Sequence, residues 1–252
     1  MNKVAAVTLS FWIMKICATT LGETGGDMLS MTFKIGYEHS SMILISIFLI
    51  TLLVQIFSKK FNPLLYWTVI LSTSTAGTTM SDFMDRTLHL GYEKGSLILI
   101  SCLFAVLITW YGSEKSLSVS NIQTRKAEMF YWIAILFSNT LGTAFGDFLS
   151  DNLSLGFIGG ALLVGSLIAL TVFAWKFTKI NSVILFWIAF VLTRPFGATF
   201  GDLLTKPIAK GGLNLGTIGS SIVLASILFA LMVFSYYKEK RLAANSDDIQ
   251  SI

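Results

Sequence analysis

The chain has 252 residues and a net charge of +4, and 54% of its residues are hydrophobic while only 13% are charged. With a mean hydropathy of +0.73, this composition indicates a membrane protein and excludes an ordinary soluble domain. We therefore expect the lipid bilayer as a partner and no binding of nucleic acid. Cys17 and Cys102 both fall inside predicted helices, which argues against a disulfide framework and against a metal–thiolate site.

Apolar segments long enough to cross a bilayer occur eight times along the chain. They cover about 4–26, 40–57, 63–84, 95–112, 128–149, 157–175, 180–203 and 214–237. We expect an all-α integral membrane protein with eight transmembrane helices, in which residues 1–242 form one membrane domain and 243–252 a short cytoplasmic tail. The first segment follows Lys3, as in a signal peptide, but no small-residue cleavage site follows it, so we interpret it as a retained helix.

Basic residues are unevenly divided between the two sets of helix ends. Eleven lie at the ends on the side of the N-terminus and five at the opposite ends. The positive-inside rule then predicts that both termini are cytoplasmic. The expected location is the inner membrane of a bacterium.

One short pattern occurs four times: an aromatic residue and a Trp, followed fifteen residues after the Trp by an Asp in a Gly- and Thr-rich octet. The pairs and their Asp residues are Phe11-Trp12 with Asp27, Tyr66-Trp67 with Asp82, Tyr131-Trp132 with Asp147, and Phe186-Trp187 with Asp202. A Gly follows each Asp, nine residues later in three copies and fourteen residues later in the fourth. Such regularity indicates internal duplication.

Each copy contains two predicted spans, so all four copies enter the membrane in the same direction. The repeats cover about 4–57, 63–112, 128–176 and 180–237. Parallel copies are most naturally related by an axis along the membrane normal, with the motif helices around the axis and the second helices facing lipid. A 2+2 arrangement of halves fits the Asp-to-Asp steps of 55, 65 and 55 equally well. Trp residues near the cytoplasmic interface would place each Asp about 22 Å away, in the outer half of the membrane.

Carboxylates at or near the end of an apolar span are costly and usually functional. The first copy alone has a second acid, Glu23, one turn before its Asp. We expect one cation-binding or proton-carrying centre formed by Asp27, Asp82, Asp147, Asp202 and Glu23, with the four Asp residues as the metal ligands. Such hard oxygen ligands suit Mg²⁺, Mn²⁺ or Ca²⁺. The alternative is four helix-end carboxylates solvated at the outer interface.

Polar side chains three, four and seven residues before each Asp share its helix face. This predicted polar stripe consists of Thr20, Thr24, Thr75, Thr78, Thr79, Thr140, Thr143 and Thr199, with Asn139 one residue further back. Arg194, present only in the fourth copy, is the predicted counter-cation of the carboxylates, or else part of a structural salt bridge.

Small residues lie five residues and one residue before each Asp, and such pairs allow helix backbones to approach closely. The glycines with this predicted packing role are Gly22, Gly26, Gly77, Gly142, Gly146, Gly197 and Gly201. Packing alone is as good an explanation of these glycines as a role in a site.

The four copies of the pattern, Trp…G-[ETA]-[TA]-x-[GS]-D, resemble a bacterial multipass family of uncharacterised membrane-anchored proteins. This resemblance covers essentially the whole chain and implies the inner membrane without supplying an activity. The segment Glu23-Thr24-Gly25-Gly26-Asp27 is also similar to the E-x-G-D-[KR]-[TS] motif of manganese and calcium exporters, although it has an extra Gly and Met28 replaces the basic residue. That similarity implies divalent cations.

An enzyme is not expected, because the GxGD motif of intramembrane aspartyl proteases fails in all four copies and no GxSxG, HExxH or P-loop motif is present. We therefore predict a cation transporter that moves divalent metal ions, or protons in exchange, through the repeat carboxylates. The alternative is a membrane scaffold or accessory subunit that uses the repeats for packing alone. No cofactor is expected, the partner is a small inorganic cation, and a homo-oligomer is compatible with the sequence.

Overall fold

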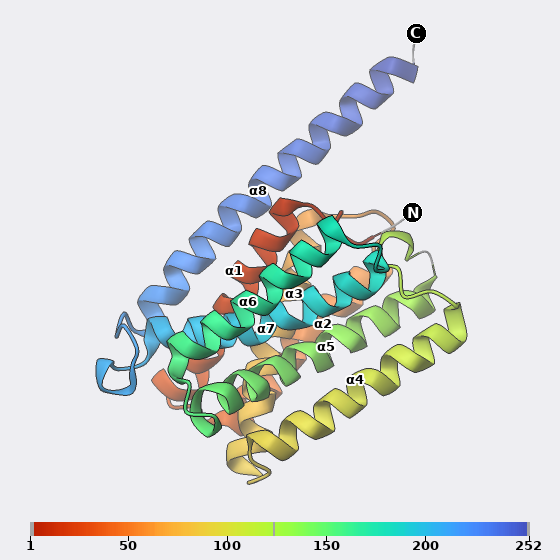
Figure 1. The fold of residues 1–252 in the computed structure, drawn as a ribbon. Coiled ribbons are helices and arrows are strands. Elements are labelled where there is room, and N and C mark those ends of the chain that lie inside the picture. Colours follow the sequence, from red (N-terminus) through yellow and green to blue (C-terminus); the bar gives the residue numbers. More distant parts are fainter. Residues whose placement is uncertain (1–2, 123, 251–252) are drawn as a thin grey trace.

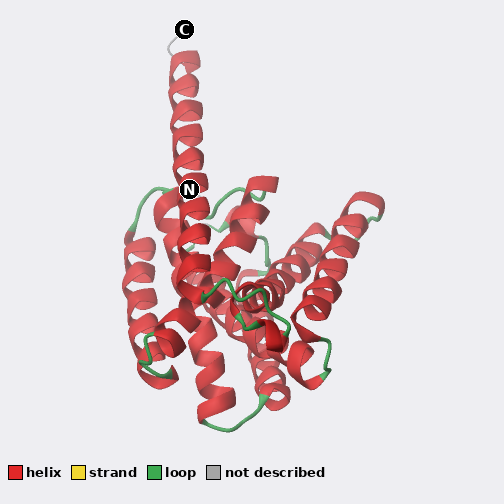
Figure 2. Ribbon diagram, turned by 90° about the vertical axis from the view of Figure 1, so that its left-hand side faces the viewer, coloured by secondary structure: helices red, strands yellow, loops and turns green. Residues whose placement is uncertain are grey.

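The computed structural model describes residues 3–122 and 124–250, with side chains except at 121 and 239–250. The described residues form helices joined by short links, with no strand among them (Figure 2). The eight α-helices are α1 (Leu9–Asp27), α2 (Tyr37–Phe57), α3 (Pro63–Asp82), α4 (Tyr92–Glu114), α5 (Arg125–Asp147), α6 (Gly156–Phe177), α7 (Ser182–Thr205) and α8 (Thr217–Gln250). Helix α8 continues through most of the predicted tail and extends away from the bundle (Figure 1); residues 251–252 lie outside the described part.

The four helices that carry the repeat Asp residues form a closed ring. Helix α1 packs against α3, α3 against α5, α5 against α7, and α7 against α1. Each second helix packs on the motif helix of the next copy: α2 on α3, α4 on α5, α6 on α7, and α8 on α1. The chain therefore closes on itself with a four-fold pseudo-symmetry. The helix packing is that of a four-fold ring and not that of two separate halves.

Six of the helices in the described part are long and apolar enough to cross a membrane: α2, α4, α5 with the turn after it, α6, α7 and α8 up to Lys238. We call α2, α4, α6 and α8 the outer helices. In the most apolar stretch of each outer helix only 22–28% of the residues are buried, whereas 67% and 61% are buried in the corresponding stretches of α5 and α7. The outer helices thus present an apolar surface to the surroundings. Helices α1 and α3, the other two members of the ring, are not among the six, and their acids, Lys15 and many of their hydroxyl side chains are buried.

The links after the motif helices share a π-helical turn in three copies and a glycine with positive φ in all four. In three copies the α-helix continues directly into a π-helical turn after the Asp: Met28–Thr32, Phe83–Thr87 and Phe148–Asn152. The repeated Gly then has a positive φ of +82°, +71°, +64° and +76° in the four copies, a conformation that side chains rarely adopt. This requirement explains the Gly that follows each Asp in the sequence.

Glycines let the motif helices interlock. Positions are numbered here from the Asp of each copy, so that −5 is five residues before it. In every copy, a Cβ on the Gly at −5 would collide with the residue at −8 of the next copy: Gly22 with Ser74, Gly77 with Asn139, Gly142 with Arg194, and Gly197 with Thr19. The glycines at −1 similarly abut position −4 of the next copy: Gly26 on Thr78, Gly146 on Ala198 and Gly201 on Glu23. Each glycine named in the sequence analysis thus lies at a close helix contact.

Aromatic side chains link the copies at the other end of the ring. The residue before the Trp in each copy contacts the Trp of the next, with ring centroids 5.5–6.4 Å apart: Phe11 with Trp67, Tyr66 with Trp132, Tyr131 with Trp187, and Phe186 with Trp12. These contacts between copies bury Trp67, Trp132 and Trp187, whereas Trp12 is partly exposed. A depth near the cytoplasmic interface stays a prediction for all four Trp residues.

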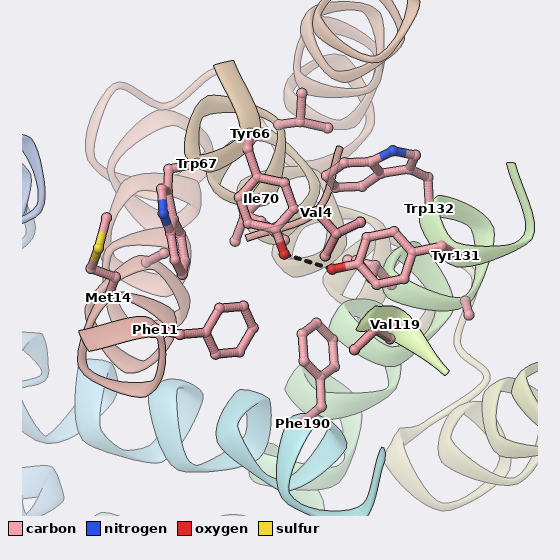
Figure 3. Packing of buried hydrophobic residues seen from close by; sticks show 14 of the residues in the cluster. Val4, Phe11, Met14, Tyr66, Trp67, Ile70, Val119, Tyr131, Trp132 and Phe190 are labelled. Atoms are coloured by element: carbon pink, nitrogen blue, oxygen red, sulfur yellow. Dashed lines mark hydrogen bonds between the residues drawn. The ribbon is translucent and has the colours of Figure 1, made fainter. Parts of the chain in front are cut away.

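The centre of this aromatic end is filled. The Tyr66 and Tyr131 hydroxyls are 2.6 Å apart and point toward one another, with Val4 and Val119 beside them (Figure 3). Val4 belongs to the segment before α1. Lys3 of the same segment forms a 2.5 Å ion pair with Glu128 on α5, which holds the segment against the ring. The aromatic end of the ring is therefore closed.

We predict that Gly197→Ala destabilises the protein. The added methyl group would lie 2.7 Å from Thr19 Cβ and 2.8 Å from its backbone carbon, and overpacking of this kind costs about 1–3 kcal/mol. Gly112→Ala is the matched control, because a Cβ there meets nothing within 4 Å and Ala is the better helix former by about 1 kcal/mol. Thermal unfolding in detergent measures both, and equal stability of the two variants would contradict the interlocking.

Candidate functional site

Equivalent positions of the four copies form stacked, buried layers within the ring, four residues or about 6 Å apart. The layer at position 0 contains the four repeat Asp residues. Position −4 contains Glu23, Thr78, Thr143 and Ala198; position −8 contains Thr19, Ser74, Asn139 and Arg194; and position −12 contains Lys15, Ile70, Ile135 and Phe190. All of these side chains are buried. Only one of the four residues at −12 is polar, whereas each of the three layers nearer the carboxylates has three or four polar residues.

The structure brings the repeat carboxylates together at one end of the ring. The four Asp side chains and Glu23 are each only 3–5% exposed, and we call these five residues the acidic cluster. Glu23, Asp27 and Asp202 each offer a carboxylate oxygen, and these oxygens lie within 4.8 Å of one another. Three carboxylates at that spacing suit a hard divalent cation, whose oxygen ligands lie about 2.0–2.6 Å from the ion.

Two basic side chains that the sequence reasoning did not assign to the site divide the Asp residues into pairs. Arg86 contacts Asp82 at 2.7 Å and Asp147 at 3.2 Å. Lys206 contacts Asp27 at 2.5 Å and Asp202 at 3.0 Å. Each base joins two neighbouring copies, so a two-fold pattern of charge is superimposed on the four-fold packing.

These two bases also form the boundary between the acidic cluster and solvent. The side chains of Arg86 and Lys206 are 38% and 19% exposed, against 4–7% for the carboxylates they contact. Burial alone would lower the pKa of Lys206, but the Asp202 and Asp27 carboxylates outweigh it and hold the pKa well above its usual value. Lys206 therefore stays charged.

Arg194 fills the centre of the ring beneath the acidic cluster. Both of its terminal nitrogens donate to Glu23 Oε2 at 3.1 Å. It also donates to the Thr78 hydroxyl on α3 and, at 2.6 Å, to the Thr143 hydroxyl on α5. One guanidinium thus contacts all three other motif helices, and its only ion-pair partner among the described residues is Glu23.

The predicted polar stripe divides into three groups. Thr78, Thr143 and Asn139 take part in the axial contacts of Arg194 and Lys15. Thr24 and Thr199 instead face the outer helices, Thr24 against Ser221 of α8 and Thr199 against Gly160 of α6. The remaining hydroxyls donate to carbonyl oxygens of their own helix: Thr20, Thr75, Thr79 and Thr140. Positions −3 and −4 differ by about 100° around a helix, so only one of them can point at the axis.

A simple signal would have found the two missed bases. Arg86 and Lys206 both lie at position +4, one turn after the Asp of copies two and four, where a base can bond back to a carboxylate. Copies one and three have Met31 and Asp151 at that position. A basic residue at +4 thus occurs in every second copy, and each such residue pairs its own copy with one neighbour.

We predict that breaking the central ion pair from one side is far more damaging than removing it whole. Arg194→Met leaves Glu23 buried without its partner, and Glu23→Gln leaves the guanidinium uncompensated, each at a cost of about 3–5 kcal/mol. The double variant Arg194→Met/Glu23→Gln should recover much of that loss. Thermal unfolding of the four proteins completes a double-mutant cycle, and additive effects would contradict the pairing.

Comparison with known families agrees with the repeat structure. A family model described as "Repeat of Unknown Function (DUF347)" matches residues 10–61, 65–116, 130–181 and 185–241. No curated protein and no solved structure matches the chain significantly. The four matched segments follow the four copies and together cover most of the sequence, so the chain belongs to the DUF347 repeat family.

Proposed function

We propose that this protein is a cation transporter of the bacterial inner membrane that moves divalent metal ions, Mn²⁺ or a similar hard ion, in exchange for protons. In this proposal all eight helices span the bilayer, with α1 and α3 shielded from lipid by the others. The ion passes through the acidic cluster at the end of the ring.

One observation carries the proposal: the acidic cluster has more acids than bases. Its five carboxylates contact three basic side chains, Arg86, Arg194 and Lys206. When all five acids are ionised, two negative charges are uncompensated within a nearly solvent-free layer. Buried charge of this kind is costly unless it is paired, and one divalent cation supplies the missing charge.

The two ends of the ring are covered by different side chains, and this difference favours a direction of access. At the carboxylate end, the partly exposed side chains of Arg86 and Lys206 lie between the acidic cluster and solvent. At the opposite end, Tyr66 and Tyr131 close the ring. An ion that enters from the carboxylate end must compete with Lys206 for the oxygens of Asp27 and Asp202, and with Arg194 for the oxygen of Glu23. Release of Arg194 from Glu23 is therefore the step that couples ion binding to movement of the ring.

A packing-only role is the competing proposal, and specific contacts favour it. The motif glycines all serve close helix contacts, and Arg86 and Lys206 join neighbouring copies as structural cross-links. A scaffold, however, needs no surplus of buried acids. The two functions differ in what loss of one negative charge should do.

The orientation gives the first test of this proposal. Both termini, the 58–62 link and the 115–124 link should be cytoplasmic, because their side of the molecule carries eleven of the basic residues and the other side five. Single cysteines introduced into these links, in a chain without Cys17 and Cys102, should react with a membrane-impermeant maleimide only after the cells are opened. Cysteines at His89 or Ser154 should react in intact spheroplasts. The reverse labelling would contradict the orientation.

Substitution of single carboxylates separates transporter from scaffold. Asp27→Asn and Asp202→Asn keep the size of the side chain but remove a ligand and a charge next to Glu23. We expect each to weaken Mn²⁺ uptake into proteoliposomes by at least about tenfold in apparent affinity, the lower end of what even outer-shell changes cost in metal sites. Asp82→Asn and Asp147→Asn, which lie on the Arg86 side, should have smaller effects.

The matched control is Asp151→Asn, because Asp151 is an exposed acid four residues after Asp147 and outside the acidic cluster. It should transport like the wild type. Quenching of a metal-sensitive dye inside the vesicles reports uptake, and gel filtration reports folding. No uptake by the wild-type protein would favour the scaffold, and wild-type uptake by all four Asp→Asn proteins would overturn the role of the repeat carboxylates.

A further inference from the structure

Lys15 lies in the middle of the ring and has no role in the acidic cluster. Its side chain is fully buried. Its Nζ donates to Asn139 Oδ1 at 3.3 Å and lies 4.1 Å from the centroid of the Phe190 ring. No carboxylate among the described residues forms an ion pair with it. An ammonium group at this position is therefore stabilised only by an amide oxygen and a ring face.

The neighbouring charges do not compensate this group. Arg194, one layer toward the carboxylates, has the same sign and is itself bound to Glu23. Tyr66 on α3 and Tyr131 on α5 lie one layer toward the aromatic end, where their hydroxyls bond to one another. On α8, the titratable residues with described side chains are all near its far end: Tyr236, Tyr237 and Lys238. On α1 itself, the other titratable groups are Cys17, Glu23 and Asp27.

Asn139 is held so that its oxygen faces Lys15. Its Nδ2 donates to Thr73 Oγ1 at 2.9 Å, and Thr73 Oγ1 donates to the carbonyl oxygen of Ile70 at 2.8 Å. The amide oxygen can accept a hydrogen bond from a neutral amine as well as from an ammonium group, which donates the stronger bond. Lys15 can therefore gain or lose a proton without losing this bond.

We propose that Lys15 carries the proton that is exchanged for the cation, an inference that rests on the proposed function. The lone pair of the neutral amine takes a proton from a hydronium ion, which leaves a water molecule, and the same N–H bond breaks when the proton returns to water. Burial without a counter-ion weakens the hold of the amine on its proton, so the proton can leave as well as bind. No other reactant is consumed.

The geometry makes the proton and the cation mutually exclusive. A divalent cation in the acidic cluster competes with Arg194 for Glu23 and leaves the guanidinium charge uncompensated one layer from Lys15. A second positive charge at Lys15 is then opposed by a like charge across a dry layer. Cation binding expels the proton, and proton uptake weakens cation binding, as an exchanger requires.

Proton release on addition of Mn²⁺ to the purified protein in weakly buffered detergent tests this assignment without a transport assay. Carboxylates also release protons when they bind a metal ion, so the comparison between variants is decisive. We expect Lys15→Met to bind Mn²⁺, measured by calorimetry, but to release about one proton fewer per ion than the wild type. Ile135→Met, in the same layer of the third copy, is the matched control and should release as many protons as the wild type.

Asn139→Asp provides a second variant of unchanged shape. Its carboxylate lies against Lys15 and holds the proton on the amine, so proton release should fall as it does in Lys15→Met. Mn²⁺ binding with wild-type proton release in both variants would overturn the role of Lys15 and leave the cation site intact. Absence of Mn²⁺ binding to the wild-type protein would overturn the proposed function and this inference with it.

Discussion

The Arg194 guanidinium is the interaction on which the arrangement of the ring depends. It is buried among four helices and receives its compensation from one carboxylate, Glu23, and from the hydroxyls of Thr78 and Thr143. A charge in this position is tolerated only where its partners are held in place. The close approach of the helices at Gly142, which abuts the stem of Arg194, is what holds them there. Packing and charge at the centre of the molecule therefore require one another.

The same helix packing occurs in all four copies, but each type of charged residue at the site, the Asp residues apart, occurs in only one or two of them. Every motif helix interlocks with the next through a glycine at −5, whereas only two copies have a base at +4 and only one has an acid at −4. Repetition supplies a rigid frame in which equivalent positions meet at one level. Divergence at single positions then turns those levels into distinct chemical layers.

Much of this could be predicted from the sequence, because it follows from repetition. Four equal spacings between a Trp and an Asp imply equivalent helices, and equivalent carboxylates must meet if the copies pack around an axis. The Gly after each Asp likewise signals a left-handed backbone conformation at the same point of each link. The spacing of residues along one helix thus predicts the height of each side chain along the ring axis and, approximately, the side of the helix on which it lies.

What the sequence did not predict depends on contacts between copies. Whether position −3 or −4 points at the axis depends on the rotation of each helix, which the interlocking glycines set. Arg86 and Lys206 were counted as basic residues of the outer links, since nothing local shows that a side chain at +4 reaches the Asp of another copy as well as its own. The burial of the Trp residues, too, follows from their contact with the preceding copy rather than from their own segment.

Helix α8 belongs to the last copy but packs on α1 of the first, in the position that α2, α4 and α6 take on the copy after them. No helical hairpin is complete by itself, since each leaves its motif helix to be covered by the preceding hairpin. The ring could thus be assembled from four separate, identical hairpins, and the order of copies along the chain is not required by the packing. Fusion into one polypeptide is what allows a single Arg194, a single Glu23 and a single Lys15 to exist. A homotetramer would have to place four guanidinium groups at the same centre, where there is room and compensation for one.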